Sequence, residues 1–173
     1  SGIQFYDGIT TAEIQEILIR SASDLIDLEH PNYQYAAARL LLFSLRKQVF
    51  GRIHDHPLLI DHVKFNVDRG VYDSEILTLY SEEEFNKLQG FIDHDRDYLF
   101  TYAGLRQVVD KYLVQDRSSG ELYESPQFMY LLISAFIFSK YPKETRLDYV
   151  KKYYDAISKH KINIPTPIMA GVR

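Results

Sequence analysis

The most apolar stretch of the sequence, residues 128–138, has hydrophobic side chains on every face of a helix. Ser125 is a typical N-cap residue, and Pro126 suits the first helical position, where its missing N–H has no intrahelical partner. The roughly dozen apolar residues fall short of the roughly 20 that a membrane-spanning helix requires. The pattern therefore predicts a helix that begins near Pro126 and is surrounded by protein.

A turn pattern directly precedes this stretch. Residues 112–115 and 121–124 are two short β-prone runs, and residues 116–120 between them contain the Ser-Ser-Gly composition of a turn. The pattern predicts a β-hairpin that leads into the buried helix.

Periodic apolar positions predict helices through most of the remaining chain. Thr10 and Glu13 form a capping box ahead of one helical pattern, and Ser81 and Glu84 form another. We expect a mainly α, helical bundle-like protein with one β-hairpin and about seven helices. The predicted helices cover residues 10–27, 33–51, 57–70, 81–91, 98–112, 126–138 and 143–159.

Composition narrows the possible functions. The 173 residues carry a formal net charge of −4 and lack the stripe of Lys and Arg that nonspecific nucleic-acid binding needs. The sequence has no cysteine, which leaves histidines and carboxylates as the available reactive groups. Because no signal peptide or lipidation motif is visible, we expect a cytoplasmic protein that binds neither nucleic acid nor membrane.

Histidines and aspartates are the most prominent candidates for chemistry. His54, His56, Asp61 and His62 lie close together in the sequence, and a second group is Asp93-His94-Asp95. One hypothesis is a helical HD-type metal-dependent phosphohydrolase that uses His62, His94 and Asp95. We favour the structural alternative, because carboxylates between predicted helices commonly cap the next helix. A third hypothesis is a helical protein-interaction module without a small-molecule site.

Six segments, taken in the order in which they occur along the chain, indicate a specific family. They are residues 3–8 (IQFYDG), 33–40 (YQYAAARL), 91–97 (FIDHDRD), 111–124 (the predicted hairpin), 141–149 (YPKETRLDY) and 165–173 (PTPIMAGVR). In this order they resemble the large (α) subunit of class Ia ribonucleoside-diphosphate reductase. The resemblance implies that residues 1–51 are the second half of an ATP cone, the allosteric activity domain. Residues 52–173 would be the helical domain that precedes the catalytic barrel, and we expect the chain to be an N-terminal piece of such a subunit.

The resemblance also implies roles for individual residues. Taken alone, Thr11 belongs to a first helical turn, and Arg46 and Lys47 are basic residues of the kind that suit a helix C-terminus. By resemblance, Thr11 and Lys47 match positions that contact the effectors ATP or dATP, and better-known bacterial members carry a histidine at Gln15. Thr166 matches the threonine that binds the phosphate side of the substrate nucleotide. A Pro-Thr-Pro turn can present its hydroxyl and N–H to a phosphate without ordering much chain.

The family reaction, which reduces ribonucleoside diphosphates to deoxyribonucleoside diphosphates for DNA synthesis, requires cysteines. This chain has none. The resemblance therefore implies no catalytic residue, metal or other cofactor here, no turnover by the chain alone, and a regulatory and scaffolding role. The implied partners are the remainder of the α subunit, a radical-generating β subunit, a second α subunit in a homodimer, and the nucleoside diphosphate substrate.

Overall fold

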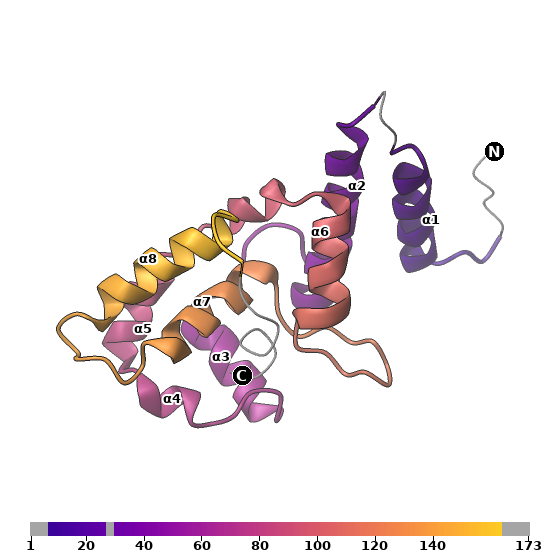
Figure 1. Cartoon of the computed structure of the whole chain (residues 1–173). Coiled ribbons are helices and arrows are strands. Elements are labelled where there is room, and N and C mark those ends of the chain that lie inside the picture. Colours follow the sequence, from indigo (N-terminus) through magenta and orange to yellow (C-terminus); the bar gives the residue numbers. More distant parts are fainter. Residues whose placement is uncertain (1–6, 27–29, 164–173) are drawn as a thin grey trace.

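A computed structural model describes residues 7–26 and 30–163 of the chain (Figure 1). This part is mainly helical, as the hydrophobic pattern predicts, and no strand is assigned in it. The described ranges contain a 3-10 helix η1, a π-helical segment η2 and eight α-helices, one more α-helix than the expected number. The elements are α1 (Thr11–Asp24), α2 (Tyr33–Phe50), α3 (Leu59–Asp68), α4 (Ile76–Leu79), α5 (Glu82–Gln89), η1 (His94–Leu99), α6 (Tyr102–Gln107), η2 (Val108–Tyr112), α7 (Pro126–Ile137) and α8 (Arg146–Ser158).

Several helix ends follow local sequence signals. At the start of α1, the Glu13 N–H donates to the Thr10 hydroxyl at 3.2 Å, and the Thr10 N–H donates to the Glu13 carboxylate at 2.7 Å. Ser81 and Glu84 repeat this exchange at the start of α5. These reciprocal bonds satisfy amide groups that a helix start leaves without partners. Both predicted capping boxes are confirmed.

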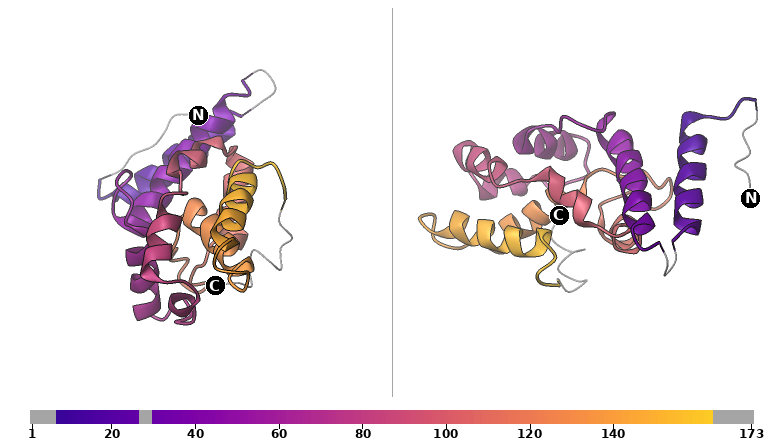
Figure 2. Two further views of the ribbon diagram at one scale, coloured as in Figure 1. Left: turned by 90° about the vertical axis from the view of Figure 1, so that its left-hand side faces the viewer. Right: turned by 90° about the horizontal axis from the view of Figure 1, so that it is seen from above.

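α7 is the centre of the hydrophobic core. Every residue from Pro126 to Ala135 is buried, and α8 packs along α7 (Figures 1 and 2). The Tyr80 hydroxyl donates to the Ala135 carbonyl at 2.6 Å. The predicted buried helix is confirmed, although Ser125 occupies the N-cap position without forming a side-chain cap bond. Among the described residues, no helix combines the length and apolar character needed to cross a membrane.

The predicted β-hairpin is present as a chain reversal with two backbone hydrogen bonds between its arms, from Tyr123 N–H to the Val114 carbonyl and from Asp116 N–H to the Glu121 carbonyl. Its arms share a single isolated antiparallel bridge, between Gln115 and Leu122, and no strand is assigned to either arm. A side chain replaces part of the expected ladder, because the Val114 N–H donates to the buried Glu124 carboxylate at 2.9 Å. The prediction of a turn was correct, and the prediction of regular strands was wrong.

The helix predicted for residues 98–112 is also interrupted. η1 ends at Leu99, Phe100 has an extended backbone with ψ 137°, and α6 then starts anew. Thr101 is the cause, since its hydroxyl accepts the Gly104 N–H at 3.2 Å and threonine is a favourable N-cap residue. After α6 the chain continues as the π-helical η2, a geometry found mostly as short bulges in helices.

α2 packs against two different parts of the chain. α1 lies along one side of α2 and α6 along another, and α1 stands at the edge of the molecule (Figures 1 and 2). α2 ends at Gly51, whose φ of 74° is a left-handed conformation that glycine adopts readily. α2 also packs against elements that follow residue 51 in the sequence, α6 and η1. A domain boundary near residue 51 stays a prediction.

Candidate functional site

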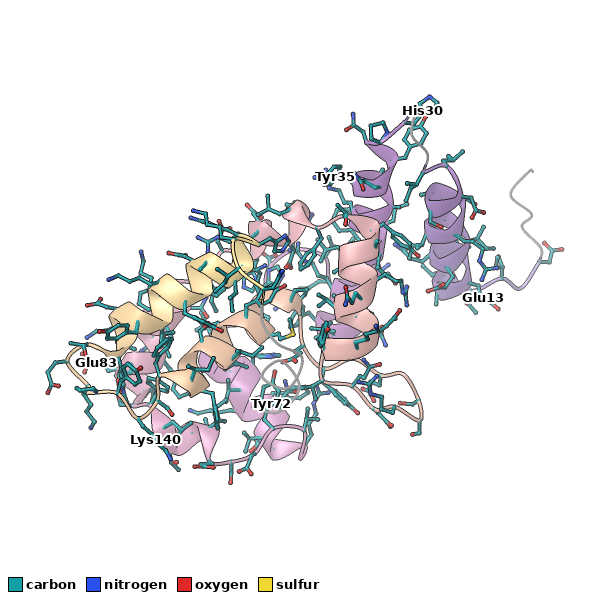
Figure 3. All side chains as sticks on the ribbon, in the orientation of Figure 1. Glu13, His30, Tyr35, Tyr72, Glu83 and Lys140 are labelled. Atoms are coloured by element: carbon teal, nitrogen blue, oxygen red, sulfur yellow. The ribbon has the colours of Figure 1, made fainter. Side chains whose placement is uncertain are left out.

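The first turn of α1 and the last turn of α2 lie at the same end of an antiparallel helix pair (Figure 1). Figure 3 shows Glu13 near this end, and His30 and Tyr35 near the opposite end. Thr11 and Lys47 both belong to the shared end, and both are exposed. Lys47 forms no ion pair within residues 7–26 and 30–163, so its ammonium group is available to an anion.

The contact between α1 and α2 includes a polar side-chain bond, and a hollow lies beside it. The Gln15 side-chain amide donates to the Leu40 carbonyl at 3.4 Å and so links the two helices. A hollow of about 300 Å³ lies next to this contact, between α2 and residues 106–122, and Glu16 is its lining residue from α1. Gln15 therefore has a structural partner on α2.

Arg46, the neighbour of Lys47, is buried and anchors the end of α2. Its Nη2 donates to the Asp97 carboxylate at 3.2 Å and to the His94 carbonyl at 2.9 Å. Its Nη1 donates to the Ile53 carbonyl and to the Tyr98 hydroxyl, each at 3.4 Å. Arg46 therefore lies near a helix end, as predicted, but its burial and its four bonds were not part of that prediction.

Asp97 extends this contact to two further helices. Its second carboxylate oxygen accepts the Gln127 side-chain N–H at 2.8 Å, and the Gln127 side-chain oxygen accepts the Tyr154 hydroxyl hydrogen at 2.6 Å. The Asp93 N–H in turn donates to the Tyr154 hydroxyl at 3.1 Å. Arg46, Asp97, Gln127 and Tyr154 form a buried polar chain, named here the Arg46 network, which connects α2, η1, α7 and α8.

The Arg46 network contains a carboxyl group with an altered pKa. Burial raises the pKa of Asp97 to about 6, while the hydrogen bond from Gln127 and the charge of Arg46 act in the opposite direction. The burial effect is the larger because the Asp97 side chain has no solvent exposure. Asp97 is thus ionised at pH 7 but takes up a proton at mildly acidic pH.

The histidines predicted as possible metal ligands are packed as aromatic rings. His56 and His94 are stacked with centroids 3.6 Å apart and ring planes at 4°, and His62 is stacked on Phe128 at 4.2 Å. Burial lowers the pKa of His56 to about 4 and the pKa values of His62 and His94 to about 3. All three are neutral at pH 7.

These residues do not form the arrangement that a metal phosphohydrolase requires. In the described part of the chain, no group of three His, Cys, Asp or Glu side chains is placed to hold a metal ion. His62 instead forms a hydrogen bond with the Tyr72 hydroxyl at 3.1 Å, and Tyr72 donates to the Glu124 carboxylate at 2.6 Å. The proposed combination of His62, His94 and Asp95 has no support in this geometry.

The structure brings together two of the three predicted contact residues. Thr11 and Lys47 share one end of the helix pair, whereas Thr166 lies outside the described residues. Sequence reasoning missed the Arg46 network. One signal was available: Arg46 continues the four-residue spacing of the buried residues Ala38 and Leu42 on α2.

Two domain families match this chain. The family described as "Ribonucleotide reductase, all-alpha domain" matches residues 98–173, and the family described as "ATP cone domain" matches residues 2–48. Over all 173 residues, the chain is 56% identical to ribonucleoside-diphosphate reductase 1 subunit alpha of Escherichia coli and 58% identical to ribonucleoside-diphosphate reductase subunit alpha of Haemophilus influenzae. The chain belongs to the ribonucleotide reductase family.

A viral member of the ribonucleotide reductase family is also similar. Ribonucleoside-diphosphate reductase subunit alpha of Enterobacteria phage T4 is 46% identical over 96% of the chain. The chain spans 23% of the length of the Escherichia coli and Haemophilus influenzae relatives and 22% of the phage relative. It therefore corresponds to one part of the reductase α subunit, and the two matched families are an ATP cone and an all-α domain.

Proposed function

We propose that this chain is a regulatory and scaffolding part of a ribonucleotide reductase α subunit. Residues 1–51 contribute to an ATP cone, and residues 52–173 form the helical domain that leads into a catalytic barrel. The complete subunit reduces ribonucleoside diphosphates to deoxyribonucleoside diphosphates. The two family matches and the 56–58% identity to reductase α subunits support this assignment.

ATP and dATP are the proposed effectors, and Thr11 and Lys47 are the proposed contacts. The observation that carries this proposal is the exposed, unpaired Lys47 at the same helix-pair end as Thr11. A lysine ammonium is a mobile point charge suited to phosphate groups, and a threonine hydroxyl can donate to a phosphate oxygen. The neighbouring Arg46 fixes the end of α2 and so limits where Lys47 can reach.

The effector test uses the chain combined with the remaining part of the α subunit and with the β subunit. Deoxynucleotide formation is measured against ATP and dATP concentration. Lys47→Gln should raise the half-effective concentrations of ATP and of dATP by roughly 10-fold, because the variant loses one charge-assisted hydrogen bond to the phosphates. Lys64→Gln, which removes an exposed charge from α3, is the matched control. An unchanged effector response in Lys47→Gln would refute this assignment.

Substrate and partner roles depend on the same assembly. Thr166 is the proposed contact to the substrate phosphate, and the remainder of the α subunit, the β subunit and a second α subunit are the proposed partners. The chain alone, given a nucleoside diphosphate, β subunit and a thiol reductant, should produce no deoxynucleotide, because it has no cysteine to carry the thiyl radical. Turnover by the chain alone would contradict the scaffolding role. A cytoplasmic location is part of this proposal.

A further inference from the structure

An arginine at the end of α3 is held between two aromatic rings. The Arg69 guanidinium carbon lies 4.4 Å from the centre of the Phe65 ring and 4.5 Å from the centre of the Tyr123 ring. Arg69 Nε and Nη2 both donate to the Asn66 side-chain oxygen, at 2.8 and 2.6 Å. Asn66 is itself buried and donates to the Tyr123 carbonyl at 3.1 Å. The guanidinium is therefore fixed in position before any ligand arrives.

This arginine has no carboxylate partner in the described residues. One side of its guanidinium is used by Asn66, and Nη1 is not engaged by any described group. Arg52, on the loop after α2, also forms no ion pair in these ranges. A cation at a helix C-terminus is favourable on its own, but this role does not require two aromatic faces and a buried amide. The arrangement is that of a guanidinium prepared for an external carboxylate.

An apolar cavity lies beside the fixed guanidinium. Its volume is about 420 Å³, and its lining includes Val49, Phe50 and Pro57 together with both arginines. Phe65 lines the same cavity and is 60% exposed, so its ring is available to an apolar group of a ligand. Asp61 is the one acidic residue of the lining, so the cavity wall carries a net positive charge on a chain whose net charge is −4.

We propose that this surface, the Arg69 pocket, docks an acidic peptide segment of a protein partner, with an apolar side chain in the cavity and a neighbouring carboxylate on Arg69. Charge complementarity selects the carboxylate, because two unpaired arginines face a single aspartate. Arginine and tyrosine, both present in this pocket as Arg69 and Tyr123, are among the residues that contribute most binding energy at protein interfaces. The cavity shares the last turn of α2 with the helix-pair end, through Val49 and Phe50. Neither Thr11 nor Lys47 lines it, so this proposal does not depend on the effector assignment.

The test is an NMR titration of the ¹⁵N-labelled chain with acetyl-Phe-Asp-amide. Saturable shifts are expected at the amides of α3 and at Tyr123. The isosteric acetyl-Phe-Asn-amide should bind at least roughly 10-fold more weakly, because it lacks the charge that strengthens the bond to Arg69. Arg69→Gln should remove this preference for the aspartate peptide. Lys64→Gln should keep it, because Lys64 is exposed on α3 but does not line the cavity.

Three outcomes would overturn the proposal. The first is the absence of saturable shifts at α3, and the second is equal affinity for the aspartate and asparagine peptides. The third is saturation of the same amides by inorganic phosphate with an affinity equal to that of the peptide, which would make this a phosphate site. Circular dichroism of Arg69→Gln serves to check that this variant is folded. Phe65→Ala, a change at an exposed side chain, is a second variant, and it should weaken binding of the aspartate peptide.

Discussion

Replacing Arg46 with methionine tests the role of the buried polar chain. Methionine keeps much of the side-chain volume but removes all the hydrogen bonds that the guanidinium donates to η1 and to the loop after α2. The Arg46 and Asp97 side chains are 2% and 0% exposed, so the remaining carboxylate cannot be solvated. Loss of one partner of a buried ion pair typically destabilises a protein by roughly 3–5 kcal/mol.

Two features place the expected loss at the lower end of this range. Asp97 keeps its hydrogen bond from Gln127, and its pKa, about 6 with Arg46 in place, rises further once the Arg46 charge is gone, so the acid becomes neutral at small expense. We expect Arg46→Met to lower the free energy of unfolding by about 3 kcal/mol at pH 7. The loss should be smaller at pH 5, where Asp97 is protonated and the guanidinium faces a neutral acid.

The assay is urea denaturation followed by circular dichroism at both pH values. Lys47→Met, a change at the exposed neighbour, should alter stability by less than about 0.5 kcal/mol. The double variant Arg46→Met with Asp97→Asn should be more stable at pH 7 than Arg46→Met alone, because the unpaired charge is gone. A loss below about 1 kcal/mol in Arg46→Met, or a double variant less stable than the single one, would refute the reasoning.

Three further predictions concern the core, the histidines and the first helix. Phe128→Ala, at a fully buried position of α7, should lower the free energy of unfolding by roughly 3–5 kcal/mol in urea denaturation, and Phe136→Ala, on the exposed end of α7, should lower it much less. His62 has a folded pKa of about 3 against the usual 6.5, so its stabilising contribution is complete above pH 6.5 and is lost as the pH falls toward 3. His62→Phe should therefore reduce the stability lost between pH 7 and pH 5 by about 2 kcal/mol, and an unchanged pH dependence would contradict the burial of a neutral imidazole. Thr10→Ala should destabilise α1 by about 1 kcal/mol, seen as faster amide hydrogen exchange in its first turn with α7 unaffected.

Sequence reasoning succeeded where the cause of the structure is local. The capping boxes at Thr10 and Ser81 and the uniformly apolar run in α7 each depend on residues a few positions apart. The break at Phe100 is also local, but the apolar spacing of residues 98–112 concealed the capping role of Thr101. The helical spacing of apolar residues alone does not show where one helix ends and the next begins.

The buried polar contacts could not be predicted because they join distant parts of the sequence. Arg46 and Asp97 are separated by 51 residues, and Tyr72 and Glu124 by 52. The spacing of Arg46 on α2 indicates a buried face, but nothing near Arg46 or Asp97 in the sequence identifies the partner of either charge. Strand formation near Glu124 failed for a more local reason, since its carboxylate takes the Val114 N–H that a strand would have used.

The attachment of α2 determines how the helix pair can move. α2 packs on α6 and is bonded at its end through the Arg46 network. These contacts oppose a hinge motion at Gly51. Most of the packing of α1 is against α2, so a displacement of α1 would act on the remaining helices mainly through the contacts of α2 with α6 and η1. We therefore expect that the two fragments obtained by cutting the chain at Gly51 would not both fold stably on their own. The second fragment would expose the face of α6 that packs on α2, and its Asp97 would lack the Arg46 guanidinium.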